Sequence, residues 1–338
     1  ERLRPPVGFC RLASIAVRIA WLTPYTSVIN NGLLSMSSIL ITGGSGFIGR
    51  HFCRQAQQLG HQLSVLTRNP EAAAARLPTS VRLIQGLSEL EADYVPEVIV
   101  NLAGEPLAAG RWTQRRKQRF YDSRINLTDR LYEFFAERNQ KHRRKPSVVI
   151  SGSAIGYYGP GQQPVNEQSS AVDGFSHQLC KTWEQSAARF ETLGSRVCYL
   201  RTGIVLGEEG ALARMLAPFK MALGGPIGSG EQGMSWIHIE DMVGAILHCI
   251  NNPQISGPVN ATAPNPVSNA QFSASLGAAL NRPAVLPMPG FMVKLLFGEM
   301  GEELLLQGQY VLPNKLLASD YRFQYSELEN ALQQIVTA

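Results

Sequence analysis

A glycine-rich segment near residue 40 has the residue types and spacing of a phosphate-binding loop. It reads TGGSGFIG and places Gly43, Gly46 and Gly49 three residues apart. In such a loop the first glycine permits a tight turn, the second lets the backbone approach a pyrophosphate, and the third lets helix and strand pack closely. N–H groups at the start of the next helix then bind the phosphates. An apolar run precedes this segment and a helix-length stretch follows it. We therefore predict dinucleotide binding by the loop, Phe47 and Ile48 included, rather than a purely structural glycine turn.

The residues that end the second apolar run indicate which dinucleotide is bound. Folds that prefer NAD place a carboxylate here, about 20 residues after the glycines, to hold the ribose 2′-hydroxyl. This chain has Thr67, Arg68 and Asn69 instead. A cation suits a 2′-phosphate, so the segment favours NADP(H), with Thr67 and Arg68 as contacts. The alternative is that Arg68 is an ordinary surface arginine.

The strands and helices that position these residues can be predicted from the sequence, in which short apolar runs alternate with helix-length segments. This alternation predicts an α/β fold with a Rossmann-like, doubly wound parallel sheet. We expect residues 1–35 to form an extension outside the fold, rather than a transit or signal peptide, and the NADP(H)-binding domain to cover 36–206. From 207 to 286 glycines and prolines separate shorter elements, which predicts a smaller substrate lobe mixed with late elements of the sheet. The six predicted strands are Ile39–Thr42, Leu63–Thr67, Val81–Ile84, Val98–Leu102, Val148–Ile150 and Val197–Leu200.

Charge and composition exclude several classes of partner. The 338 residues carry a net charge of +5, but residues 1–35 hold four basic residues and one acid, which leaves 27 basic and 25 acidic residues in the body. We therefore expect no nucleic-acid partner. No run of about 18 apolar residues is present, so we expect neither a spanning helix nor a membrane partner. The five cysteines are widely spaced without a C-x-x-C pair, which argues against a metal site and for a reducing compartment, the cytoplasm.

Five segments together resemble the extended short-chain dehydrogenase/reductase superfamily. They are Thr42–Gly49, Asn101–Gly104, Ser153–Gly159, Arg201–Gly207 and Trp236–Asp241. The LAGE, GGPIGSG and WIHI stretches are similar to a divergent branch, the epimerase family proteins related to nucleoside-diphosphate-sugar epimerases. The resemblance implies a C-terminal substrate lobe and, over 287–338, a small domain of unknown function. It also implies NADP(H) contacts from Asn101, Leu102, Ala103, Gly104, Ser151, Gly203 and Val205.

The resemblance also indicates where catalytic residues belong. Superfamily members use a serine or threonine, a Tyr-x-x-x-Lys pair and an upstream asparagine. Ser153 matches the serine, with a turn serine as the alternative, and Tyr157 or Tyr158 matches an aromatic that lines the substrate pocket. With Glu184 setting the register, Ser176 and Cys180 stand at the Tyr and Lys positions.

The replacement of Tyr and Lys leaves the acid–base group open. A serine is too weak an acid to replace a phenol, but a thiol near positive charge can ionise at neutral pH. We therefore expect Cys180 to be the acid–base candidate, with a buried packing residue as the alternative. A rival pair is His177 and Lys181, four residues apart on the same helix.

Arg124 occupies the position of the superfamily's asparagine. Burying an unpaired guanidinium is costly, so we expect Arg124 to contact a cofactor phosphate or an acidic substrate. The alternative is an ion pair with a neighbouring carboxylate.

These residues predict an NADP(H)-binding oxidoreductase or epimerase with an altered active site. The alternative is a protein that binds NADP(H) as structure or as a redox signal without catalysis. The partners that we expect are an unidentified small-molecule substrate and, for assembly, a homodimer.

Overall fold

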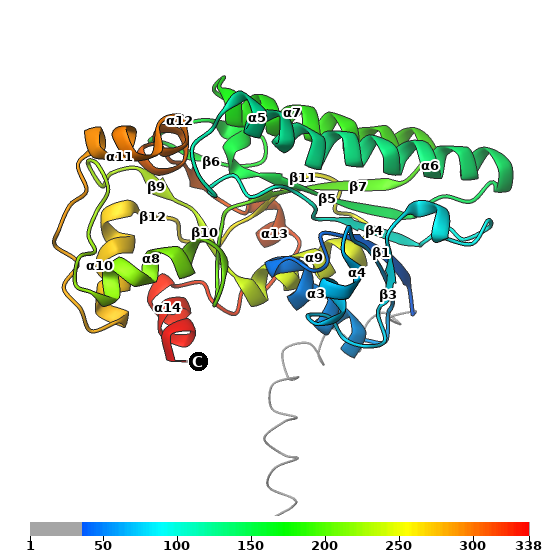
Figure 1. Cartoon of the computed structure of the whole chain (residues 1–338), viewed down its shortest axis with the longest axis horizontal. Coiled ribbons are helices and arrows are strands. Elements are labelled where there is room, and N and C mark those ends of the chain that lie inside the picture. The colour runs from blue at the N-terminus through cyan, green and yellow to red at the C-terminus, as the bar shows by residue number, and fades with distance from the viewer. Residues whose placement is uncertain (1–35, 338) are drawn as a thin grey trace, which may run out of the picture.

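The computed structural model describes residues 36–337, and the predicted N-terminal extension over 1–35 lies outside this range. Its centre is a seven-stranded sheet in which all neighbours are parallel, in the order β11-β7-β5-β4-β1-β2-β3 (Figure 1). The strands are β1 (Ser38–Thr42), β2 (Gln62–Leu66), β3 (Arg82–Ile84), β4 (Val98–Asn101), β5 (Val148–Ala154), β7 (Arg196–Thr202) and β11 (Gly257–Ala261). The predicted doubly wound, Rossmann-like α/β fold is confirmed, and β11 is a strand that we did not predict.

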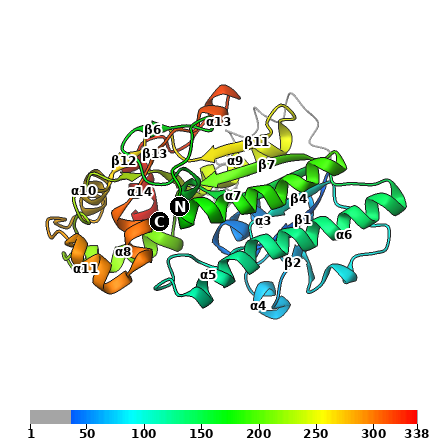
Figure 2. The same cartoon turned by 90° about the horizontal axis from the view of Figure 1, so that it is seen from above.

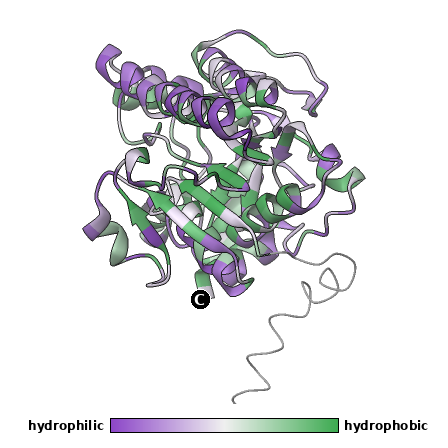
Figure 3. Ribbon diagram, turned by 90° about the vertical axis from the view of Figure 1, so that its right-hand side faces the viewer, coloured by the Kyte–Doolittle hydropathy of each residue, from purple (hydrophilic) through white to green (hydrophobic). Residues whose placement is uncertain are grey.

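Helices cover both faces of this sheet. On one face α3 (Phe47–Gln58) and α9 (Ile239–Asn251) bury Phe52, Met242 and Val243 against the strands. On the other face α6 (Leu127–His142) buries Leu131 and Phe135, and α7 (Phe175–Ala188) buries Ala187. Figure 3 shows the result, with hydrophobic strands between helices whose outer surfaces are hydrophilic. None of the helices within residues 36–337 is long and apolar enough to cross a bilayer.

The helical stretch between β4 and β5 is divided in the structure. It consists of α5 (Gln114–Tyr121), a π-helical turn η3 (Asp122–Asn126) and α6. The turn adds a residue to the helical repeat and rotates the side chains that follow it. Such π turns are frequent at functional sites, and this one contains Arg124.

The second half of the chain builds a lobe beside the carboxyl ends of the strands. Its helices are α8 (Gly210–Lys220), α10 (Asn269–Ala279), α11 (Gly290–Phe297), α12 (Glu299–Gly301), α13 (Asn314–Ala318) and α14 (Leu328–Thr337). Its short strands pair as β8 (Ile204–Leu206) with β10 (Trp236–His238), β9 (Gly233–Met234) with β12 (Val267–Ser268), and β13 (Tyr310–Val311) with β6 (Pro164–Val165). The remaining elements are α4 (Pro70–Ala74), the 3-10 turns η2 (Leu87–Glu89), η4 (Ile155–Tyr158) and η5 (Arg189–Leu193), and the π turn η6 (Glu302–Leu306).

The Trp236–Asp241 motif joins this lobe to the sheet. The Asp241 carboxylate is fully buried and accepts backbone N–H bonds from Gln324 at 2.8 Å and Tyr325 at 2.9 Å. His238 is also buried, and its Nε2 lies 3.0 Å from Oε1 of Gln334 in α14. The motif therefore holds the C-terminal segment in place.

Candidate functional site

A cavity of about 1200 Å³ lies at the carboxyl ends of β1, β2 and β4. Ligands of open α/β sheets bind at this edge, where the connections from neighbouring strands diverge. The cavity contains seven of the predicted cofactor residues, which come from three separate loops. They are Gly43, Gly46, Thr67, Arg68, Leu102, Ala103 and Gly104.

The glycine loop has the form that a pyrophosphate requires. Gly43 has a φ of 70°, and a Cβ there would lie 2.7 Å from the backbone of Leu102. A Cβ on Gly49 would lie only 2.3 Å from the carbonyl oxygen of Gly43, so α3 could not approach the strand as it does. Gly46 caps α3 without any side-chain bond. The N–H groups of the first helical turn are thus left for a phosphate.

The end of the cavity beside β2 carries positive charge. Arg68 follows β2, Arg76 follows α4, and both are exposed on the cavity wall. No carboxylate stands at the end of β2, since the acidic lining residues Glu105 and Asp122 come from other segments. Arg76 was not among the predicted residues, and its only sequence cue is that it lies eight residues after Arg68.

The side chain of Asn101, a predicted cofactor contact, is engaged within the protein and does not line the cavity. Its Oδ1 accepts a bond from Thr42 Oγ1 at 2.6 Å, and its Nδ2 donates to Thr128 Oγ1 at 2.8 Å. Thr128 in turn donates to the Arg124 carbonyl at 2.6 Å. Thr42, Asn101 and Thr128 are all buried. This chain of bonds connects the end of β1 to the π turn and fixes the backbone of Arg124.

Several other predicted cofactor residues do not line this cavity and contact other parts of the protein. Phe47 lies against Gly207 and Gly210, and Ile48 and Val205 pack against the main hydrophobic core. The Ser151 hydroxyl donates to the Gly152 carbonyl. A Cβ on Gly203 would lie 2.6 Å from the Ser235 carbonyl oxygen, so this glycine permits a close backbone approach.

Arg124 is a buried cation without a carboxylate partner in the part of the chain that the structure describes. It is 9% exposed and donates to the Glu105 carbonyl oxygen at 3.0 Å and to Ser123 Oγ at 3.3 Å. Burial lowers the pKa of its guanidinium to about 10, so it stays charged at neutral pH. A Cβ on Gly104 would lie 2.9 Å from this guanidinium, which therefore stacks on the loop after β4. The ion pair that we considered as the alternative is not formed within residues 36–337, and the guanidinium carbon lies 5.2 Å from the Trp183 ring centroid. Arg124 does not line the cavity described above.

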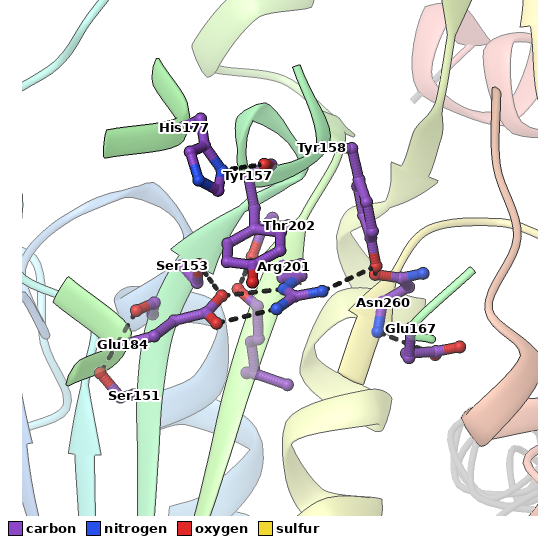
Figure 4. A network of polar contacts seen from close by, with 12 residues as sticks. Ser151, Ser153, Tyr157, Tyr158, Glu167, His177, Glu184, Arg201, Thr202 and Asn260 are labelled. Atoms are coloured by element: carbon purple, nitrogen blue, oxygen red, sulfur yellow. Dashed lines mark hydrogen bonds and ion pairs between the residues drawn. The ribbon is translucent and has the colours of Figure 1, made fainter. Parts of the chain in front are cut away.

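Ser153 lies in a buried polar network (Figure 4). Its hydroxyl donates to Glu184 Oε1 at 2.7 Å. The same carboxylate accepts two bonds from Arg201, from Nε at 2.8 Å and from Nη2 at 2.9 Å. All three side chains are buried. Charge-assisted bidentate pairs of this kind fix orientation strongly.

The two tyrosines after Ser153 differ in their surroundings. Tyr158 is buried and its hydroxyl donates to Asn260 Oδ1 at 2.6 Å, while burial raises its pKa. The Tyr157 ring is partly exposed and lies 3.4 Å from the Arg201 guanidinium carbon (Figure 4). Tyr157 is therefore the phenol of the two that a ligand can reach.

The structure corrects our expectation for Cys180. Its side chain is 4% exposed, and burial, with a contribution from the Glu184 carboxylate, raises the pKa of the thiol to about 11. The thiolate that we expected near neutral pH is disfavoured. Ser176 is also engaged, because its hydroxyl donates to Glu303 Oε2 at 2.6 Å in the C-terminal lobe.

The rival pair of His177 and Lys181 does not share a site. His177 is buried, and its Nδ1–H donates to the Tyr157 carbonyl oxygen at 2.5 Å. Lys181 is exposed on the surface of α7. His177 therefore holds the turn that carries Tyr157 rather than forming an acid–base pair with Lys181.

The chain matches two family models. Residues 39–261 match the NAD dependent epimerase/dehydratase family, and residues 288–335 match a domain of unknown function, DUF1731. Epimerase family protein YfhF of Bacillus subtilis (strain 168) is 39% identical over 88% of this chain and 98% of its own length. The chloroplastic SDR39U1 homolog of Arabidopsis thaliana is 35% identical over 89% of this chain and 87% of its own length.

The solved structures that resemble this chain are also epimerase family members. The human epimerase family protein SDR39U1 (isoform2), crystallised with NADPH, is 31% identical, with a TM-score of 0.77 over 89% of this chain and 99% of its own. The nucleoside-diphosphate sugar epimerase from Corynebacterium glutamicum is 29% identical, with a TM-score of 0.72 over 96% of this chain and 63% of its own.

Proposed function

The chain belongs to the NAD dependent epimerase/dehydratase family, and from this premise we propose that it is an NADP(H)-dependent oxidoreductase or epimerase with an altered acid–base group. The observation that carries the proposal is the cavity at the sheet edge. It combines an open helix N-terminus for a pyrophosphate with two arginines and no carboxylate at the end beside β2.

The choice of NADP(H) over NAD(H) rests on Arg68 and Arg76. Guanidinium groups form charge-assisted bonds with phosphate, and a carboxylate that would repel a 2′-phosphate is missing from the end of β2. The human relative crystallised with NADPH supports the same choice. Both arginines are exposed, so solvent and salt moderate their effect.

The chemistry that we propose is hydride transfer, which a nicotinamide dinucleotide supplies when it is bound. Tyr157 is the candidate proton donor, because it is the phenol near Ser153 that a substrate can reach. Arg201 lies under its ring and is itself neutralised by Glu184. A sugar-nucleotide epimerase of the usual kind is disfavoured, since Ser176 stands where its phenol belongs.

The second candidate function is NADP(H) binding without catalysis. It is favoured by the Ser153 hydroxyl, which already donates to Glu184, and by the Cys180 thiol, which burial keeps protonated. For either function we propose a small-molecule ligand, a homodimer and a reducing compartment such as the cytoplasm. Cys53, Cys198 and Cys249 are, like Cys180, free and buried.

The proposed function is tested by measuring hydride transfer with an isotope label. NADPH carrying deuterium at C4 is incubated with the protein and a small-molecule extract, and products are analysed by mass spectrometry. A reductase yields a deuterated product, and Tyr157→Phe lowers its rate at least about tenfold. An epimerase returns the hydride that it takes from its substrate, so it transfers no label from NADPH and is detected instead by transient formation of reduced nicotinamide when the protein holding NADP⁺ is mixed with the extract. Tyr132→Phe is the matched control, since it removes only an exposed hydroxyl contact with Thr192. Tight NADPH binding with no label transferred and no reduction of bound NADP⁺ by the extract would favour the non-catalytic function.

A further inference from the structure

Large apolar side chains exposed to solvent are concentrated on one part of the molecule. Within the described chain twelve such residues are exposed, and nine of them fall in residues 221–223 and 285–296. Val285 is 74% exposed, Phe291 70% and Leu295 69%. Apolar patches of this kind on a folded protein usually mark an interaction site.

The two segments form one continuous surface, which we call the α11 surface (residues 221–223 and 285–296). The Leu286 N–H donates to the Gly224 carbonyl at 3.2 Å, and the Met288 N–H donates to the Pro226 carbonyl at 2.9 Å. The helix α11 follows directly. Figures 1 and 2 both place α11 at the end of the molecule opposite α6.

The helix α11 gains little from the core of its own chain. Val293 is its single buried residue among eight, although the helix reads GFMVKLLF. The helix is held instead through its last carbonyls, where Arg111 donates to Leu296 O at 2.9 Å and also to Leu295 O. Phe297 at the end of the helix packs partly against the cluster that contains Trp112 and Phe120. The side chains of Phe291, Met292, Leu295 and Leu296 are exposed and left for a partner outside the chain.

The charge around the α11 surface is positive. Residues 210–230 and 276–302 contain four cations, Arg214, Lys220, Arg282 and Lys294, against two glutamates, Glu299 and Glu302. Lys294 pairs with Glu302 at 2.8 Å, while Arg214 and Arg282 donate only to backbone carbonyls. A second copy placed face to face on this surface would bring like charges together. The expected partner is therefore apolar at its centre and anionic at its rim.

We propose that the α11 surface docks onto the surface of a membrane that carries anionic lipids. Phenylalanine, methionine and leucine side chains enter the headgroup boundary, and the flanking cations bind lipid phosphates. Lys294 lies among the apolar residues, where an ammonium on a long stem can reach headgroups. Lysine is by contrast depleted in protein–protein interfaces, which favours a bilayer over a protein partner.

This docking is peripheral. With eight residues, α11 is far shorter than the roughly 20 that a spanning helix needs. Our expectation of no membrane partner rested on the absence of a spanning segment, and the α11 surface requires none.

The test is co-sedimentation of the full chain with vesicles. Vesicles of phosphatidylcholine with about one third phosphatidylglycerol are compared with vesicles of pure phosphatidylcholine. We expect binding to the anionic vesicles that weakens as NaCl is raised. The double variant Phe291→Glu, Leu295→Glu should bind about tenfold more weakly or not at all. Both positions are exposed, so the variant should fold, and its thermal melt verifies this.

Matched controls come from exposed apolar residues elsewhere. Val172→Glu and Leu317→Glu, combined in one double variant, add the same charge outside the α11 surface and should leave vesicle binding unchanged. The variants also separate this surface from residues 1–35, whose four arginines could attract anionic vesicles on their own. Absence of binding, or binding that the double variant does not reduce, overturns the proposal. A dimer in light scattering that the double variant dissociates, without vesicle binding, would instead identify a second copy as the partner.

Discussion

The buried pair of Glu184 and Arg201 should be a large single contribution to the stability of the site. Glu184→Gln keeps the shape of the side chain but removes its charge, so the Arg201 guanidinium, which is 4% exposed, loses its counter-ion. Removing one partner of a buried ion pair costs about 3–5 kcal/mol, because the other charge stays buried and unpaired. Glutamine can still accept from Ser153, so we expect a cost of about 3 kcal/mol.

This cost is measurable by urea unfolding followed by circular dichroism. For a chain of this size about 3 kcal/mol corresponds to a fall of about 5 °C in Tm. Ser153→Ala is the smaller perturbation, since it removes one hydrogen bond to the same carboxylate, and should cost about 1 kcal/mol.

A double-mutant cycle tests the reasoning itself. Arg201→Met combined with Glu184→Gln should cost clearly less than the sum of the two single changes, because the double variant leaves no buried charge. If Glu184→Gln costs less than about 1 kcal/mol, or if the two changes are additive, the pair is not the buried, mutually dependent unit that its geometry indicates.

Three further predictions follow from other buried groups. Burial lowers the pKa of His238 from 6.5 to about 4. The contribution of uncharged His238 to the free energy of unfolding is therefore complete above pH 6.5, and up to about 3 kcal/mol of it is lost as the pH falls toward 4. In urea unfolding measured across this pH range, His238→Gln should lose less stability than the parent protein. Cys180, whose thiol pKa is raised to about 11, should be alkylated much more slowly at neutral pH than free cysteine, and labelling as fast as that of free cysteine, followed by mass spectrometry, would restore its catalytic role. Arg124→Asn should weaken NADPH binding about tenfold while changing stability by less than about 1 kcal/mol, since no carboxylate loses a partner; a large loss of stability at unchanged affinity would show a structural role.

Most of the sheet is predictable from the sequence because its strands are buried and apolar. The six runs ending with Val197–Leu200 all correspond to observed strands. The strand β11 escaped prediction because it reads GPVNA, with glycine, proline and asparagine among five residues. It lies at the edge of the sheet, where a proline is tolerated. Local composition therefore gave no indication of a strand that tertiary pairing with β7 creates.

One part of the candidate site can be predicted from the sequence and another part cannot. The glycine loop is predictable because strand, turn and helix are contiguous in sequence. The network of Ser153, Glu184 and Arg201 is not, because it joins residues 17 and 31 positions apart whose approach depends on the packing of α7 on the sheet. Sequence reasoning used Glu184 only to set the register. It also gave the wrong direction for the Cys180 pKa, because burial cannot be read from a helix position alone.

The central claim, a cavity built for NADP(H), is tested most directly by comparing the dissociation constants of NADPH and NADH by isothermal titration calorimetry. We predict that NADPH binds about tenfold more tightly, or better, and that Arg68→Ala and Arg76→Ala each reduce this preference with little effect on NADH. Arg82→Ala is the matched control, because Arg82 is an exposed arginine on β3 that pairs with Glu91 outside the cavity. Equal affinities for the two dinucleotides, or a preference that neither cavity arginine affects, would contradict the account.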